Sequence, residues 1–192
     1  MNTTKQDIFN VARSLFIQKG FKKTNISEIT KIAGIAVGTF YNFYSSKEEI
    51  FMDVFLKEDQ ELKKKIMTSI DFDREVFIVL REMIPQLLGG MKENPILVEW
   101  YKKENFKDII KKVGEPYVEN SSVEDVFYPF FLDVVGKWQS QGKIDPDRDR
   151  EYILALFNSV ALIDVHRDEI GEEYFPRLLE DLIWFIAKGL EP

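Results

Sequence analysis

Apolar side chains recur at helical spacing along nearly the whole chain. Ile8, Val11, Ala12, Leu15 and Phe16 fall at positions i, i+3, i+4, i+7 and i+8, which places them on one face of a helix. The same spacing returns in later segments, and most of these are bounded by a capping residue or a glycine. The sequence contains no alternating strand pattern, internal repeat or low-complexity tract. It therefore predicts an all-α protein of about nine helices.

Caps and glycines set the expected boundaries of the first helices. Gly20 is expected to end the first helix, and Gly34 the second. Asn25 and Ser46 each precede a glutamate by three residues, which is the spacing of a capping box. They are expected to open the second helix and a long helix that starts near residue 47. A short third helix is expected over residues 37–43.

Longer segments follow beyond residue 70. The Gly89-Gly90 pair is expected to end one helix, and Asn94 followed by proline to open another. The last two helices are predicted at about 147–167 and 172–189. Both have broad apolar faces, wider than an isolated surface helix needs.

Composition narrows the class of protein. The 192 residues include no Cys and one His, which excludes a disulfide framework and a Cys nucleophile. Metal centres and His-based acid–base catalysis are disfavoured, so we expect no enzyme, no metal site and no cofactor. No apolar run approaches the roughly 20 residues that span a bilayer, and the first residues lack a signal-peptide design. We expect a cytoplasmic protein with no membrane partner.

Charge is distributed unevenly along the chain. The whole sequence has 26 Lys or Arg against 33 Asp or Glu, a net charge of −7. Residues 1–50 carry seven basic and four acidic side chains, a net charge of +3, and the remaining residues carry −10. This asymmetry indicates a small basic domain attached to a larger acidic body.

The segment of residues 24–43 has the pattern of a helix-turn-helix. Its sequence is TNISEITKIAGIAVGTFYNF, with two short helical stretches separated by a turn at Gly34. The second stretch begins with small side chains, which allow the start of a helix to approach DNA closely. The pattern alone leaves an ordinary helical hairpin open as an alternative.

A spaced signature of apolar, glycine, aromatic and polar positions runs through the first 51 residues. Its members are Ile8, Ala12, Phe16, Gly20, Thr24, Ile29, Ala33, Gly34, Ile35, Gly38, Thr39, Phe40, Tyr41, Tyr44, Ser46, Lys47 and Glu48. With these residues, positions 8–51 resemble the N-terminal domain of the tetracycline-repressor (TetR) family of bacterial regulators. The resemblance covers the N-terminal quarter of the chain, and the remainder matches only in helix count and in the turn-like segment 142–149. It implies a DNA-binding domain over residues 1–47, with its recognition motif at 24–43, and a ligand-binding and dimerisation domain over 48–192.

The resemblance also implies which residues contact DNA. They lie at the start of the second helix, along the recognition helix and at the start of the long helix. The candidates are Thr24, Asn25, Ser27, Ala36, Val37, Gly38, Thr39, Tyr41, Asn42 and Lys47. Two positions depart from the family pattern, because Ala36 stands where the family usually has Ser and Thr30 where it usually has Ala.

For the acidic body the resemblance implies a ligand cavity and a dimer interface. The ligand-binding candidates, each of which could instead be an ordinary core residue, are Trp100, Tyr101, Phe106, Phe127, Phe130, Phe131, Trp138 and Asp164. For Asp164 a ligand cation, a pairing with Arg167 across an interface, and a solvated surface position all stay open. The dimer candidates, which could instead pack within one subunit, are Phe157, Val160, Ala161, Phe175, Leu178, Leu179, Leu182 and Ile186.

These features together favour a homodimeric, ligand-responsive repressor that a small lipophilic effector releases from a double-stranded DNA operator. An acidic body rich in aromatic side chains favours a neutral or cationic effector over a polyanion. The main alternative is an all-helical protein-binding adaptor without specific DNA binding. An enzyme on a helical scaffold is disfavoured, because the chain lacks a Gly-rich phosphate loop and paired metal-ligand motifs.

Overall fold

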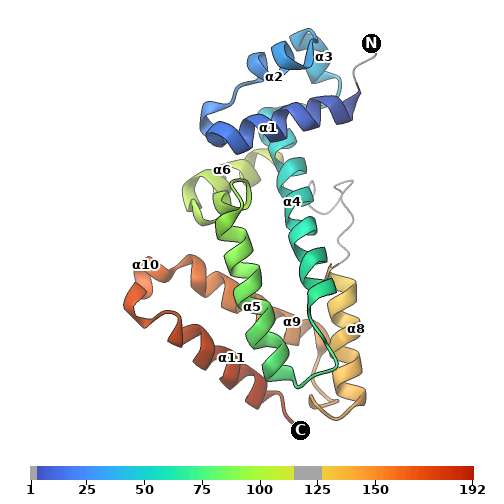
Figure 1. Cartoon of the computed structure of the whole chain (residues 1–192), viewed down its shortest axis with the longest axis vertical. Helices are drawn as coiled ribbons and strands as arrows, with labels where there is room; N and C mark the ends of the chain where they lie inside the picture. Colours follow the sequence, from blue (N-terminus) through green and yellow to red (C-terminus); the bar gives the residue numbers. More distant parts are fainter. Residues whose placement is uncertain (1–3, 115–126) are drawn as a thin grey trace. The chain divides into compact units, whose positions relative to one another are not determined.

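The computed structural model describes residues 4–114 and 127–192, and this part of the chain is all-helical. It contains ten α-helices and two 3-10 helices and no strand, which confirms the predicted fold class (Figure 1). The chain divides into two compact units, residues 1–59 with 91–124 and residues 60–90 with 125–192. None of the described helices is long and apolar enough to cross a membrane.

The first unit holds the N-terminal helices and one later segment. Its elements are α1 (Lys5–Lys23), α2 (Ile26–Ala33), α3 (Val37–Tyr41), the first half of α4 (Lys47–Ser69), the end of α5 (Val76–Glu93), η1 (Leu97–Tyr101) and α6 (Lys103–Val113). The predicted boundary between a DNA-binding domain and a ligand-binding domain at residue 47 stays a prediction. The two compact units divide α4 after residue 59 instead. The start of α4 belongs to the first unit because its side chains Ile50 and Phe51 are fully buried in the N-terminal core.

Aromatic packing builds the core of this unit. The Phe51 ring lies 5.2 Å from the Phe16 ring and 4.8 Å from the Phe21 ring, measured between centroids. Gly20 has φ 78° and ψ 168°, so α1 is interrupted at the residue that was expected to end it. This break turns the chain so that Phe21 can pack on α4.

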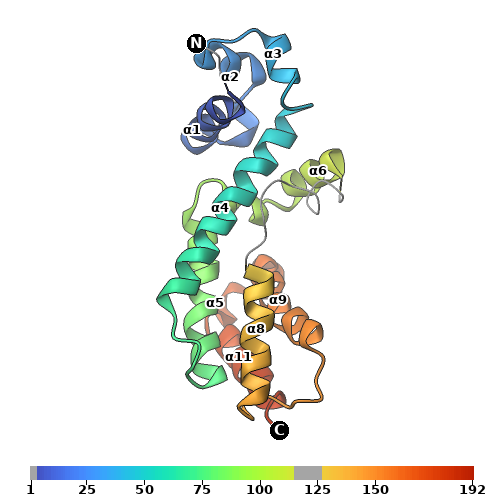
Figure 2. The same cartoon turned by 90° about the vertical axis from the view of Figure 1, so that its right-hand side faces the viewer.

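The second unit is formed by the rest of α4, most of α5 and the C-terminal helices. These are α8 (Phe127–Ser140), α9 (Arg150–Val165), α10 (Arg167–Ile170), η2 (Glu172–Tyr174) and α11 (Arg177–Gly189). Helix α9 lies beside both α8 and α11 (Figures 1 and 2). The fully buried Trp138 lies in the core and donates its indole N–H to the carbonyl of Phe72 at 2.8 Å.

Three of the predicted helices differ from the structure. The last helix starts at Arg177, after the separate 3-10 helix η2, and not at about residue 172. Helix α5 continues past the Gly89-Gly90 pair to Glu93, and a Cβ at Gly90 would meet a methyl carbon of Leu62. Gly90 therefore lies against the Leu62 side chain of α4, and it does not end the helix. After Asn94 the chain forms the 3-10 helix η1, and not the predicted α-helix. The N-cap of η1 is Ile96, whose backbone N–H donates to the Asn94 side chain at 2.8 Å.

Candidate functional site

The turn between α2 and α3 has the geometry that a helix-turn-helix requires. Gly34 adopts a left-handed conformation, with φ 69° and ψ 30°, and the N–H of Ile35 donates to the carbonyl of Thr30 at 3.0 Å. Glycine adopts this conformation without a steric penalty. At the other end of α2, the Asn25 side chain accepts the backbone N–H of Glu28 at 2.9 Å. These two signals in the sequence fix both ends of α2.

Helix α3 has one anchoring face and one open face. Phe40 is fully buried, whereas Val37 and Tyr41 are 46% and 54% exposed. Gly38 is also exposed, and a Cβ placed on it would have no neighbour within 4 Å. The open face therefore presents small and aromatic side chains on a helix whose opposite side is held by the core. Such a face suits contact with base edges in a DNA groove.

The remaining DNA-contact candidates around α2 and α3 have mixed exposure. Asn25, Ser27, Ala36 and Asn42 are exposed, and Thr39 is half-buried. No side-chain hydrogen bond caps α3 at Ala36, as expected where a serine is missing.

Two further candidates are held inside the first unit. Thr24 is 1% exposed, and its hydroxyl donates to the carbonyl of Gly20 at 2.9 Å, so it is not part of the open surface. The Lys47 ammonium donates to the carbonyls of Phe21 at 2.9 Å and Thr24 at 3.0 Å, and it lies 4.1 Å from the centroid of the Phe21 ring. Burial lowers the pKa of Lys47 from its ordinary value. In this conformation Lys47 joins the start of α4 to the end of α1.

A cavity of about 130 Å³ lies within the second unit. Phe127 and Phe131, two of the ligand candidates, line it with parallel rings 5.5 Å apart. The structure also places Phe157 and Ala161, two of the predicted dimer-interface residues, on this wall. The full lining is Lys63, Met83, Ile84, Leu87, Leu88, Phe127, Tyr128, Phe131, Leu154, Phe157, Asn158 and Ala161.

The other aromatic ligand candidates do not line this cavity. The Phe130 ring packs edge-on against Phe72 at 5.1 Å, and Trp138 is a core residue. Tyr101 belongs to the first unit, where the Lys92 ammonium lies 5.2 Å from the centroid of its ring. The side chains of Trp100 and Phe106 lie outside the described residues.

Asp164 is neither solvated nor on the cavity wall. Its side chain is fully buried, and one carboxylate oxygen accepts two bonds from the guanidinium of Arg167, at 2.5 and 3.2 Å. Arg167 also lies over the Phe175 ring, 4.5 Å from the centroid. The pairing with Arg167 therefore occurs within one chain, between the end of α9 and the start of α10.

The dimer candidates divide by exposure. Phe157, Val160, Phe175 and Leu179 are buried within the single chain, whereas Ala161, Leu178, Leu182 and Ile186 are partly exposed. The most exposed apolar side chains of α9 and α11 are others, namely Tyr152 (54%), Leu162 (52%), Trp184 (43%) and Phe185 (62%).

Sequence reasoning missed these four residues and most of the cavity wall. Helical periodicity predicts broad apolar faces on α9 and α11, but a face that packs inside the subunit and a face that stays open have the same composition. Only the packing of neighbouring helices distinguishes them.

Comparison with known proteins connects this geometry to a family. Residues 8–54 match the sequence model of the family described as bacterial regulatory proteins, tetR family. The transcriptional regulator QacR of Staphylococcus aureus is 27% identical over 122 residues, which cover 60% of this chain and 65% of QacR. Two further curated regulators are matched over only 32% and 40% of their lengths.

Solved structures support the same fold. FadR of Thermus thermophilus, a TetR family transcriptional repressor solved in complex with lauroyl-CoA, aligns over 96% of this chain and 92% of its own, with a TM-score of 0.61 and 21% identity. FadR of Bacillus subtilis, solved in complex with stearoyl-CoA, aligns over 98% of this chain and 100% of its own, with a TM-score of 0.61 and 15% identity. These relatives are transcriptional regulators and not enzymes. This agrees with the expectation drawn from the sequence of the present chain, which has no Cys and one His.

Proposed function

Because the chain belongs to the TetR family of bacterial regulatory proteins, we propose that it is a homodimeric, DNA-binding transcriptional repressor that responds to a small lipophilic effector. The main support for this proposal is that the region matching the family contains a helix, α3, whose outer face is exposed. Phe40 holds α3 on the core while Val37, Gly38 and Tyr41 stay open for DNA.

The salt dependence of duplex DNA binding distinguishes a repressor from a protein-binding adaptor. A protein that neutralises phosphates releases counterions, so its affinity falls steeply as salt rises. We expect the full chain to retain duplex DNA at low salt and to lose affinity by about tenfold or more between about 50 and 200 mM salt. No retention of any duplex at low salt would favour the adaptor.

The proposed dimer interface uses the outer faces of α9 and α11. Leu178, Leu182 and Phe185 recur at helical spacing on α11, and Leu162 is exposed on α9 beside it. Two such helices from each copy can pack as a four-helix bundle, which buries these side chains and places two recognition helices in one particle.

Changing Phe185 to glutamate is expected to dissociate this dimer, because a buried charge without a partner is costly at an apolar interface. We expect the dimer dissociation constant to rise by about 100-fold or more, measured by analytical ultracentrifugation. Tyr174→Glu is the matched control, since Tyr174 is 58% exposed but lies on η2. Equal assembly of the Phe185 variant and the wild type would contradict this interface.

The cavity of the second unit is the proposed effector site. Its wall is mainly apolar, and its volume of about 130 Å³ is close to that of an engineered cavity of about 150 Å³ that binds benzene. Lys63 is its one charged lining residue in the described part of the chain, and it lies 5.5 Å from the centroid of the Phe127 ring. This wall suits a neutral or anionic lipophile better than a cation, which changes the expectation drawn from the charge of the whole body.

Filling the cavity is expected to remove the effector response and keep DNA binding. Ala161→Phe places a ring in the cavity, whereas Ala161→Ser leaves it open. Phenol, benzoate and benzylammonium can serve as probes, with binding followed by thermal shift. We expect the phenylalanine variant to lose affinity for phenol or benzoate by about tenfold or more, relative to the serine variant. Equal affinity of both variants would place the effector elsewhere.

The proposed response is a shift in population. Helix α4 is continuous from Lys47 to Ser69 and supplies residues to both compact units, so it links them covalently. An effector that binds one arrangement of the dimer more tightly favours that arrangement. We propose that this arrangement separates the recognition helices by a distance that no longer matches half-sites one helical turn apart.

A further inference from the structure

The open face of α3 carries no charged side chain. Val37 is the only aliphatic side chain of α3, and it is 46% exposed. Its neighbours Ala36 and Gly38 are exposed as well, and both are small enough to leave the Val37 methyl groups accessible. Residues 32–46, which contain the turn and the whole of α3, include no Lys, Arg, His, Asp or Glu. Any base that this face recognises is therefore read by apolar contact or by neutral hydrogen-bonding groups.

The arginine nearest to α3 in the N-terminal helices is engaged elsewhere. Arg13 is the only arginine in residues 1–50, and its guanidinium donates to the carboxylate of Glu58 on α4. Bidentate contact from an arginine or lysine to guanine is the commonest specific contact in the major groove. Helices α1 to α3 therefore place no arginine on the open face of α3 to select a G·C pair.

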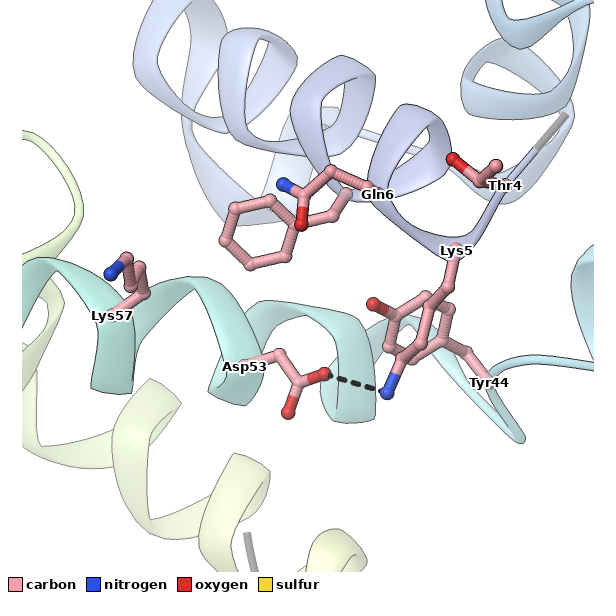
Figure 3. Close-up of a pocket in the computed structure, with 7 residues that line it drawn as sticks. Thr4, Lys5, Gln6, Tyr44, Asp53 and Lys57 are labelled. Atoms are coloured by element: carbon pink, nitrogen blue, oxygen red, sulfur yellow. Dashed lines mark ion pairs between the residues drawn. The ribbon is translucent and has the colours of Figure 1, made fainter. Parts of the chain in front are cut away.

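The lysines of this region lie off α3. The Lys5 ammonium, at the start of α1, lies 3.3 Å from a carboxylate oxygen of the buried Asp53 (Figure 3). Lys22, Lys23 and Lys31 are exposed, but they lie on α1 and α2. Charges at these places suit the phosphate backbone, which positions a protein on DNA but does not specify the sequence.

The groups that α3 does offer match the major-groove edge of an A·T pair. Thymine presents a C5-methyl group there, which makes apolar contacts, whereas guanine and cytosine present hydrogen-bonding groups. The exposed Asn42, directly after α3, carries an amide of the kind that pairs with adenine. Val37 and Asn42 therefore both favour A·T over G·C.

We propose that α3 selects A·T base pairs, and that Val37 recognises the C5-methyl group of a thymine in each half-site. The inference rests on the proposed DNA-binding function and names the class of sequence which that function selects. Contact between the Val37 methyl groups and the thymine methyl group removes apolar surface from water on both partners. Cytosine and uracil lack this methyl group, so either base at the same position loses the contact.

The test removes single methyl groups from the DNA and from the protein. A duplex is first selected from a random-sequence pool by the full chain, and each of its thymines is then replaced by uracil at equivalent positions of both half-sites. Uracil lacks only the C5-methyl group and still pairs with adenine. At one thymine position we expect the wild type to lose affinity by about fourfold for each half-site, which is the effect of one buried methyl group.

Val37→Ala is the matching change in the protein. It shortens an exposed side chain, so we expect the fold to be kept. The thymine and uracil duplexes are expected to bind this variant with equal affinity, because the contact is already absent. Ile32→Ala is the matched control, since Ile32 is 57% exposed but lies on α2. This control is expected to keep the difference between the two duplexes.

Equal affinity of the wild type for the thymine and uracil duplexes at every position would overturn the proposal while leaving DNA binding intact. Selected half-sites that lack thymine would overturn it in the same way. If Ile32→Ala removes the difference and Val37→Ala keeps it, the methyl group is read by α2, and the role given to Val37 is wrong. A wild type that retains no duplex would instead overturn the DNA-binding function itself.

Discussion

Replacing Gly38 by glutamate is expected to abolish operator binding while leaving the protein folded. Gly38 lies on the exposed face of α3, and a side chain there meets no protein atom within 4 Å of its Cβ. On DNA the same side chain would enter the space next to the base edges and bring a negative charge close to the phosphates. We expect affinity to fall by about 100-fold or more, equivalent to about 2.7 kcal/mol.

Fluorescence anisotropy with a labelled operator, at fixed salt, measures this loss. Gly189→Glu is the matched control, because Gly189 is exposed on α11, has an equally open Cβ position and gives the same change in charge. The control is expected to bind with wild-type affinity. If the Gly38 variant binds equally well, the open face of α3 does not face DNA, and the placement of the recognition helix is wrong.

Replacing Arg167 by methionine is expected to produce the largest loss of stability. The Asp164 side chain is fully buried, and the guanidinium of Arg167 donates to it at 2.5 Å. Methionine keeps an apolar stem on the Phe175 ring but removes the guanidinium that donates twice to the buried Asp164 carboxylate. Removing one partner of a buried ion pair costs about 3 kcal/mol or more. The free energy of unfolding is therefore expected to fall by about that amount.

Denaturation in urea, followed by circular dichroism, measures this change. Arg177→Met is the matched control, since Arg177 is 89% exposed and pairs with Asp181 at 3.6 Å on the surface of α11. An exposed pair of this kind contributes little, so the control is expected to unfold at nearly the wild-type midpoint. Equal midpoints for the two variants would show that the buried pair is not a main support of the α9–α10 junction.

The helix-turn-helix was predictable from sequence because its signals are local. Asn25 caps α2, Gly34 adopts the left-handed conformation that ends it, and Phe40 is the apolar residue that faces the core. Each of these roles depends on residues close in the chain, so spacing and residue type were enough.

Long-range contacts set the features that the sequence could not reveal. The Gly89-Gly90 pair is typical of a helix end, but α5 continues through it to Glu93, with the Leu62 side chain of α4 beside Gly90. Lys47 has the charge of a phosphate ligand, but carbonyls at the end of α1 hold its ammonium. Phe157 suits a dimer interface by periodicity, and the packing of α8 against α9 places it on the cavity wall.

Asp164 shows the same limit at a single residue. An aspartate on an apolar helix face is compatible with a ligand contact, an interface or solvent, and sequence alone left these three open. The turn into α10 brings Arg167 back onto its carboxylate, and this pairing follows from the path of the chain after α9. Local spacing thus identifies a charged partner three residues away but not whether the pair is buried.

The central claim is that this chain recognises DNA with two copies of α3. Selection of bound duplexes from a random-sequence pool by the full chain tests it directly. We expect enrichment of an inverted repeat whose half-sites lie about one helical turn, or about 10 base pairs, apart. Each duplex is expected to bind an even number of protein chains, because the protein binds as dimers. Recovery of no enriched sequence, or of one without twofold symmetry, would contradict it.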